Sequence, residues 1–342
     1  MKTALDLLPI VQSKIVSPVL IALGAPWPVT QLVGALLDHE VGCFQMDLFQ
    51  AQRLREKLKQ EDLAAEVVVH GDLWDLPAKF GTVIFPSAAG ADRELKLDIV
   101  EQGFQVLVEG GRFITLSEYE RDDTFGKLHK KVFGKCSASP GTEAGSCFWS
   151  TREGDAPRRR HEIAFRAKIG DGESQQFISW PGTFGYGAMD AGSRAMLEVA
   201  DVRSGDKILD LGCGNGSVGC LASPMAGPTG SVLFVDSNAR ALKLTEINAA
   251  ANGVKNYKLL LSADLLDVPV GEFDVVLANP PYYANSEVGR MFITTAREVL
   301  RPGGRFYFVT KMPVRTIPEI VDLFGTVESV ENRGYTVVIA TA

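Results

Sequence analysis

The chain contains the same strand and helix pattern twice, and this internal repeat limits most strongly how it can fold. Three pairs of segments match in the same order: 19–26 with 208–215, 72–88 with 264–281, and 105–116 with 298–309. The last pair shares a Gly-Gly-Arg-Phe block. A chain of 342 residues suits roughly two domains of about 150 residues each. We therefore predict a gene duplication and two similar domains.

Short apolar runs in the second copy alternate with helical segments. The predicted strands are 207–211, 231–235, 257–261, 274–278 and 305–309. Asn238 is the predicted N-cap of a helix that stops at Gly253, and Ser286 opens another that ends at Pro302. Continuous apolar strands that alternate with helices predict a parallel sheet with its ligands at the carboxyl edge.

The tail 326–341 predicts a hairpin around Asn332-Arg333-Gly334. We therefore expect an α/β fold of two tandem Rossmann-like domains, each a doubly wound, mostly parallel sheet with a C-terminal antiparallel hairpin. The charged segment 151–172 lies between the copies, and we place the domain boundary near 155. The apolar and polar residues of 163–169 alternate, which predicts a strand that opens the second domain.

The two copies differ in their polar residues. Asp210, Gly212, Gly214 and Gly216 of the second copy face Ala22, Gly24, Pro26 and Pro28 of the first. The motif Asn279-Pro280-Pro281-Tyr282 faces Pro86-Ser87-Ala88-Ala89, whereas Asp47 ends a short apolar run as Asp236 does. We therefore expect a degenerate domain at 1–155, without a cofactor site, and a catalytic domain at 156–342.

The glycine-rich loop at 210–216 admits two ligands. Gly214, Gly216 and Gly219 fit the G-x-G-x-x-G pattern, and Asp236 follows where a dinucleotide fold places its ribose-binding acid. A nicotinamide oxidoreductase is therefore an alternative. However, the carboxylate of Asp210 at the strand end suits an ammonium group, which S-adenosylmethionine carries, better than a pyrophosphate.

The motif Asn279-Pro280-Pro281-Tyr282 places a rigid polar loop at the same edge, because Pro280 restricts the backbone of Asn279. With Asp-Leu-Gly-Cys-Gly-Asn-Gly at 210–216, this motif resembles class I S-adenosylmethionine-dependent methyltransferases that act on exocyclic or amide nitrogens. The resemblance covers 155–342.

The whole-chain arrangement, a degenerate domain before an active one, resembles the RsmC and RlmG families of ribosomal RNA (guanine-N2) methyltransferases. Their sequence before the glycine loop resembles Pro181-Gly182-Thr183-Phe184 and Asp190-Ala191-Gly192-Ser193. Those families usually have Phe at the position of Tyr282, and Tyr is commoner in the adenine-N6 and glutamine-N5 enzymes. The resemblance implies guanine-N2 methylation of ribosomal RNA, with nucleic-acid adenine-N6 or protein glutamine-N5 methylation as alternatives.

The same resemblance implies the site residues. Those expected on the cofactor are Asp210, Gly212, Gly214, Gly216, Asp236, Ser237, Asp264, Leu265 and Asn279. Asn279, Pro280 and Tyr282 are expected to be catalytic, because the Asn279 oxygen and the Pro280 carbonyl would accept the two N–H bonds of the target amine, and Tyr282 would stack on the base. Phe184 and Ser193 are expected on the substrate.

The charge of the chain limits how it contacts nucleic acid. Lys and Arg number 35 and Asp and Glu 42, a net charge of −7, so any RNA contact must be a local patch. One basic run contains Lys127, His129, Lys130, Lys131 and Lys135, and another contains Arg152, Arg158, Arg159, Arg160, Arg166 and Lys168. We expect these runs to bind phosphates, with ribosomal RNA or a ribosomal subunit as the partner.

Five cysteines without metal-like spacing predict free thiols in a reducing compartment and no metal site. Cys213 and Cys220, near the glycine loop, are expected to be packing residues. The apolar stretch 15–29 is interrupted by prolines, and no signal segment is evident. We expect a cytoplasmic monomer that does not bind membranes.

Overall fold

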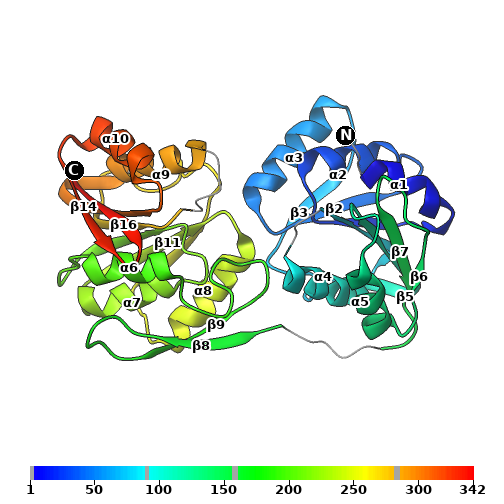
Figure 1. Cartoon of the computed structure of the whole chain (residues 1–342), viewed down its shortest axis with the longest axis horizontal. Helices are drawn as coiled ribbons and strands as arrows, with labels where there is room; N and C mark the ends of the chain where they lie inside the picture. Colours follow the sequence, from blue (N-terminus) through cyan, green and yellow to red (C-terminus); the bar gives the residue numbers. More distant parts are fainter. Residues whose placement is uncertain (1–3, 89–91, 156–160, 281–285) are drawn as a thin grey trace. The chain divides into compact units, whose positions relative to one another are not determined.

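The computed structural model describes residues 4–88, 92–155, 161–280 and 286–342. The chain divides into two compact units, Met1–His161 (unit 1) and Glu162–Ala342 (unit 2) (Figure 1). The predicted boundary at 155 adjoins residues 156–160, which lie outside the described residues.

Unit 1 is built on a seven-stranded sheet of order β3-β2-β1-β4-β5-β7-β6. The strands are β1 (Val19–Ala22), β2 (Val41–Gln45), β3 (Glu66–Val69), β4 (Phe80–Ser87), β5 (Leu107–Ser117), β6 (Ser137–Ala138) and β7 (Ser146–Thr151). The helices are α1 (Ala4–Val11), η1 (Gln12–Lys14), α2 (Pro26–Gly34), α3 (Leu48–Gln60), α4 (Arg93–Val106) and α5 (Asp123–Phe133). The first five strands of the order are parallel, and β7 and β6 are antiparallel.

Unit 2 repeats this topology in the order β12-β11-β10-β13-β14-β16-β15. Its strands are β8 (Ile163–Ala167), β9 (Gln175–Ser179), β10 (Lys207–Leu211), β11 (Ser231–Asp236), β12 (Tyr257–Leu261), β13 (Phe273–Ala278), β14 (Leu300–Thr310), β15 (Val327–Asn332) and β16 (Tyr335–Thr341). Its helices are α6 (Ala191–Val199), α7 (Ser217–Ala226), α8 (Ala239–Ala251), α9 (Ser286–Val299) and α10 (Pro313–Phe324). The strands β8 and β9 form a separate antiparallel pair. The predicted fold, two doubly wound sheets that end in antiparallel hairpins, is confirmed.

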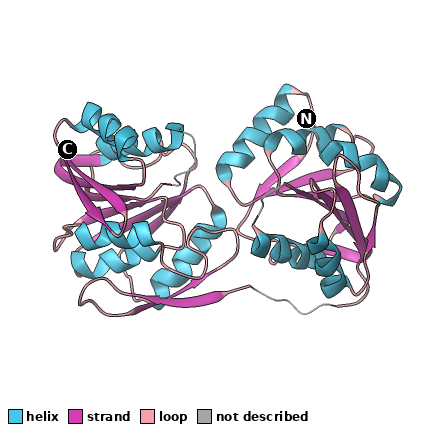
Figure 2. Cartoon of the chain, viewed as in Figure 1, coloured by secondary structure: helices cyan, strands magenta, loops and turns pink. Residues whose placement is uncertain are grey.

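Helices cover both faces of each sheet (Figure 2). In unit 2 the helices α6, α7 and α8 pack on one face and α9 and α10 on the other, and all six residues of β13 between them are buried. Burial on both faces explains why the strands are continuous apolar runs. In the described residues, no helix is long and apolar enough to cross a bilayer. All five cysteines are free thiols.

The predicted end of the helix that starts at Ser286 is wrong by about one turn. The helix stops at Val299, because Leu300 already pairs with Phe273 in the sheet. Pro302 therefore lies in the irregular first part of β14, before the regular pairing that begins at Arg305. Leu107 begins β5 of unit 1 in the same way, by pairing with Phe80.

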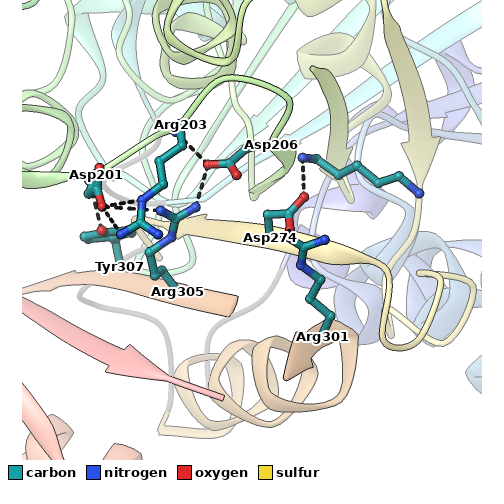
Figure 3. Close-up of polar contacts among 8 residues, drawn as sticks. Asp201, Arg203, Asp206, Asp274, Arg301, Arg305 and Tyr307 are labelled. Carbon is teal, nitrogen blue, oxygen red and sulfur yellow. Dashed lines mark hydrogen bonds and ion pairs between the residues drawn. The ribbon is translucent and has the colours of Figure 1, made fainter. Parts of the chain in front are cut away.

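A cluster of charged side chains lies at the amino-terminal edge of the unit 2 sheet (Figure 3). The guanidinium of Arg305 on β14 donates to Asp206 at 2.5 Å and to Asp201 at 3.3 Å. Arg301 forms an ion pair with Asp274, the second residue of β13. Every arginine at this edge that Figure 3 labels, Arg203 included, faces a carboxylate. The cluster ties β14 to the segment that leads into β10.

Candidate active site

The glycine-rich loop joins β10 to α7 at the carboxyl edge of the unit 2 sheet. Gly212, Gly214 and Gly216 have φ angles of 75°, 57° and 76°, a region that side chains disfavour. A Cβ on Gly216 would lie 2.8 Å from Thr245 of α8, so this position also needs glycine for the close approach. The loop thus exposes its backbone to a ligand without side chains in the way.

The Asp210 carboxylate lies beneath this loop. Its Oδ2 accepts the backbone N–H of Gly219 in the first turn of α7, at 2.8 Å, and its side chain lines the pocket beside Gly212 and Gly214. Burial raises the pKa of Asp210 to about 7, the bond from Gly219 lowers it, and the charge of Asp236 raises it again. Asp210 is therefore poised to hold a cationic group.

The Asp236 carboxylate ends β11 and holds the loop from the other side. Its Oδ2 accepts the N–H of Gly214, and its Oδ1 accepts the N–H of Asn238, each at 2.8 Å. A carboxylate only accepts hydrogen bonds and has about four acceptor sites, a chemistry that suits the hydroxyls of a ligand. Ser237, the next predicted cofactor residue, is half-buried.

Asp264 and Leu265 follow β12 at the same edge. Asp264 is exposed, and its Oδ1 accepts the N–H of Leu266 at 3.2 Å. Leu265 is buried with a φ of 63°, which is rare for a residue with a side chain and marks a tightly held turn. The turn directs the carboxylate of Asp264 into solvent, at a strand end next to that of Asp236.

Asn279 and Pro280 follow β13, the strand beside β10. The Asn279 amide donates both Nδ2 hydrogens, one to Asp190 Oδ1 and one to Ser193 Oγ, each at 2.8 Å. Asp190 also caps α6 by accepting the N–H of Ser193. A carboxylate only accepts hydrogen bonds, so the amide must turn its nitrogen toward Asp190 and its oxygen away from it. The orientation of the Asn279 oxygen is therefore fixed before a substrate arrives.

One pocket brings many of the predicted residues together. It is lined by the glycine loop, Asp210, Asn279, Ser193 and Phe184. Phe184 is half-exposed, whereas Ser193 is buried with its hydroxyl on Asn279, so Ser193 supports Asn279 rather than offering an open surface. Asp236 adjoins this pocket through its bond to Gly214. Asp264 is not among the lining residues.

Several supporting residues were not predicted from the sequence. Helix α8 supplies three of them: Thr245 donates to the carbonyl of Gly214, Asn248 donates to that of Asn215, and the buried Arg240 donates to that of Pro181. The available signal was a set of polar residues at helical spacing on the buried face of α8. The role of Asp190 gave no such signal, since its partner Asn279 is 89 residues away.

Some predicted residues lie outside this description or elsewhere in the fold. Tyr282, Arg158, Arg159 and Arg160 are outside the described residues. His129, expected within a basic run, is instead buried between Thr115 and Ser150, and burial lowers its pKa to about 3. The neutral imidazole is part of the unit 1 core, so its inclusion in a phosphate-binding surface is wrong.

Cys213 and Cys220 are buried beside the loop. Burial raises the pKa of both thiols, which keeps them protonated and inert. In the part of the chain that the structure describes, no group of three or more His, Cys, Asp or Glu side chains is arranged to hold a metal ion.

The sheet registers align the two units and correct the sequence match. Ile21 pairs with Cys43 and Ile84 as Asp210 pairs with Phe234 and Leu277, so Ile21 rather than Ala22 stands where unit 2 has Asp210. The apolar side chain of Ile21 cannot replace the carboxylate.

The match of Asp47 with Asp236 is also wrong. Asp47 caps α3 through the N–H of Gln50, which is the role of Asn238 at α8. The residue that follows the last β1–β2 pair, as Asp236 follows the equivalent pair in unit 2, is Gln45. Gln45 donates to the carbonyl of Gly24 at 3.0 Å and thus connects the end of β2 to the loop after β1, as Asp236 connects β11 to the glycine-rich loop.

The loop itself is shorter in unit 1. Only residues 23–25 join β1 to α2, whereas 212–216 join β10 to α7, so Pro26 and Pro28 lie in the first turn of α2 and not in the loop. Pro86, which stands where unit 2 has Asn279, lies against the loop: a Cβ on Gly24 would be 2.8 Å from its ring. An apolar ring thus lies beside the loop of unit 1 where unit 2 has the amide of Asn279.

The chain is similar in sequence to known methyltransferases. Residues 174–339 match the family described as the methyltransferase small domain. The chain is 28% identical over 223 residues to the ribosomal RNA large subunit methyltransferase G of Streptomyces avermitilis, covering 62% of this chain and 58% of that protein. It is 30% identical over 182 residues to the ribosomal RNA small subunit methyltransferase C of Pseudomonas entomophila, covering 52% and 54%. The chain thus spans about half the length of these curated relatives.

A solved structure resembles the whole chain. The T. thermophilus 16S rRNA N2 methyltransferase (RsmC), in complex with AdoMet and guanosine, superposes with a TM-score of 0.77 and 22% identity. The similarity covers 99% of this chain and 91% of that one. Both units of the chain therefore have the fold of that protein.

Proposed function

We propose, on the premise that residues 174–339 form a methyltransferase small domain, that this chain transfers a methyl group from S-adenosylmethionine to the exocyclic N2 of a guanine in ribosomal RNA. The observation that carries the proposal is the fixed amide of Asn279 in a pocket beside a glycine-rich loop. The curated relatives, which act on ribosomal RNA by name, support the substrate. The family match favours methyl transfer over nicotinamide chemistry.

The residues of the pocket suit the proposed cofactor. Asp210 offers a buried carboxylate to the ammonium of the methionine end, next to the backbone of Gly212 and Gly214. Asp236 would hold the ribose hydroxyls, with Ser237 beside it. Asp264 and Leu265 would hold the adenine. S-adenosylmethionine, when bound, supplies an electrophilic methyl group on its sulfonium.

The proposed chemistry is positioning of the amine. Its lone pair is delocalised into the base, so the amine is a poor nucleophile. The oxygen of Asn279 would accept one N–H and the carbonyl of Pro280 the other, which localises the lone pair and aims it at the methyl group. The N–C bond would form as the methyl–sulfur bond breaks, the thioether would be the leaving group, and one amine proton would pass to water. Asp190 and Ser193 act through Asn279 as positioning residues. Phe184 and Tyr282 would contact the flipped base.

Adenine-N6 and glutamine-N5 methylation would use the same two acceptors, and the tyrosine at 282 keeps both as alternatives. The role of 1–155 as a degenerate domain without a cofactor site is part of the proposal, supported by Ile21, Pro86 and the shortened loop. Phosphate binding by Arg158, Arg159 and Arg160, the monomeric state and the cytoplasmic location stay predictions.

Replacing Asn279 tests the mechanism. We expect Asn279→Ala to lower kcat for methyl transfer about 100-fold or more while the Kd for S-adenosylmethionine changes only about twofold, because the lost oxygen positions the amine in the transition state and Asn279 is only one of nine residues expected on the cofactor. Turnover and calorimetric binding measure the two effects. Asn256→Ala, which changes an amide at the opposite edge of the sheet, is the control and should leave kcat unaltered. Retained turnover in Asn279→Ala would refute the mechanism.

A further inference from the structure

A second cleft, of about 350 Å³, lies at the amino-terminal edge of the unit 1 sheet. Its volume is within the range of small-ligand pockets, about 300–1,000 Å³. Its lining includes the charged side chains of Lys14, Arg112, Lys135 and Glu153 and the ring of Trp149. These residues come from η1, β5, the segment before β6, β7 and the segment after β7. The proposed active site of unit 2, by contrast, lies at the carboxyl edge of its own sheet.

The two units differ sharply in charge at this edge. Arg112 pairs with Thr82 and Thr151 as Arg305 pairs with Val275 and Thr341, so the two arginines stand at the same place in the fold. In unit 2 two carboxylates face Arg305, as Figure 3 shows. In unit 1 the Arg112 guanidinium donates to the carbonyl of Lys14 at 2.6 Å, and no carboxylate of the described residues forms an ion pair with it.

Two acids of the unit 2 cluster, Asp206 and Asp274, have no acidic counterparts in unit 1. Ser17 stands two residues before Val19, where Asp206 stands two residues before Ile208. Gly81 stands where unit 2 has Asp274, and a Cβ there would lie 2.7 Å from the carbonyl oxygens of Val16 and Ser17. An acidic side chain at 81 is therefore excluded by the path of the chain, and among the described residues the charge of Arg112 has no carboxylate partner.

The remaining cations leave the cleft positive. Lys14 holds its ammonium 4.7 Å above the ring of Trp149, which fixes its position without neutralising it. Lys135, with 88% of its side chain exposed, forms an ion pair at 3.7 Å with Glu153, which is also exposed, and such a surface pair is weak. Three cations against one carboxylate favour an anion, in a chain whose net charge is −7.

We propose that this cleft binds backbone phosphates of the substrate RNA and thereby docks the RNA on unit 1. The inference rests on the proposed function for the identity of the nucleic acid. Lysine and arginine side chains suit phosphate contacts, which position an RNA without reading its sequence. The edge at which ion pairs neutralise the arginines in unit 2 is thus a docking site for RNA in unit 1.

The salt dependence of RNA binding tests the site without relying on methyl transfer. We measure Kd of the full chain for labelled rRNA fragments of both subunits, without cofactor, between 50 and 200 mM salt. Loss of two phosphate contacts in Lys14→Gln/Lys135→Gln should reduce the slope of log K against log salt by about 1.5. Lys135→Gln alone, at an exposed side chain, should reduce it by about half as much. The control is Lys207→Gln, at the same edge of unit 2 and paired with Glu272, which should leave the slope unaltered.

Each result decides the proposal. An unaltered slope in the lysine variants, with wild-type folding by thermal melting, would overturn the RNA site even if the enzyme methylates rRNA. If the wild-type chain binds inorganic phosphate or GMP at this cleft and the variants lose only that binding, the site serves a small anion and the RNA proposal is wrong. Reduced slopes in the variants would support RNA docking even if methyl transfer to rRNA failed.

Discussion

At the scale of single residues, the Asp210 carboxyl lines the pocket beside the glycine loop and is the proposed partner of the ammonium group of the cofactor. Its carboxyl has a pKa near 7 because it is buried, so it is largely protonated below neutral pH. A bound ammonium group would lower this pKa, and binding would then release a proton. The raised pKa of Asp210 also affects folding. Between about pH 4 and pH 7 the unfolded chain loses the Asp210 proton while the folded chain keeps it, so the free energy of unfolding falls as the pH rises.

This linkage predicts the pH dependence of cofactor affinity. Between pH 7 and pH 5.5 the Kd for S-adenosylmethionine should rise by up to tenfold per pH unit, because the proton on Asp210 competes with the ligand's positive charge. Calorimetry at several pH values measures it, and Asp210→Asn, which cannot ionise, is the matched comparison. The idea fails if affinity in the wild-type chain is flat with pH, or if the Asn variant keeps the same dependence.

The sequence was sufficient to predict that Asn279, Asp210 and the glycines lie together, because each follows a buried strand and adjacent parallel strands meet at one edge. It was not sufficient to identify Asp190, which meets Asn279 only after α6 has packed on the sheet. Nor did it show that Ser193 faces Asn279 rather than the substrate. Such contacts depend on tertiary packing, which no local pattern encodes.

At the scale of elements, apolar runs and caps predicted the strands and helix α8 closely, and the alignment of the copies failed where the loops differ in length. The repeat was matched at one fixed offset beyond β1, so the two-residue deletion before α2 shifted the partner of Asp236 from Gln45 to Asp47. The partner of Asp210 was misread by one residue, although the matched segments 19–26 and 208–215 already place Ile21 opposite it. Hydrogen-bond register in the sheet fixes those partners unambiguously. The sequence also could not reveal that Leu300 would pair with Phe273 and end α9 early.

The ion-pair cluster that ties β14 to the segment before β10 yields a stability prediction. Arg305 has only 11% of its side chain exposed and faces Asp206, which has 7%. Arg305→Met should lower the free energy of unfolding of unit 2 by about 3 kcal/mol, because it leaves a buried carboxylate unpaired. Urea denaturation measures the loss. Arg203→Met, at an exposed pair with Asp201, should cost less than about 1 kcal/mol, and equal losses in both variants would contradict the assignment.

At the scale of the whole molecule, the duplicated fold serves two different purposes in our account. Both units have the same seven-stranded topology, which the order of apolar runs and the shared Gly-Gly-Arg-Phe block made predictable. Unit 2 keeps a buried carboxylate, a long glycine loop and a fixed amide. Unit 1 replaces them with Ile21, a short loop and Pro86, and carries positive charge at its opposite edge.

The most direct test of the central claim is the product of methyl transfer. Labelled S-adenosylmethionine is offered with the full chain to total rRNA, ribosomal subunits, tRNA and a release factor side by side, and the product is identified by nucleoside or peptide mass analysis. We predict label in rRNA as N2-methylguanosine, absent with Asn279→Ala. Label in adenine or in protein glutamine, with none in guanine, would contradict the assignment of the substrate, and the absence of any transfer would contradict the enzyme itself.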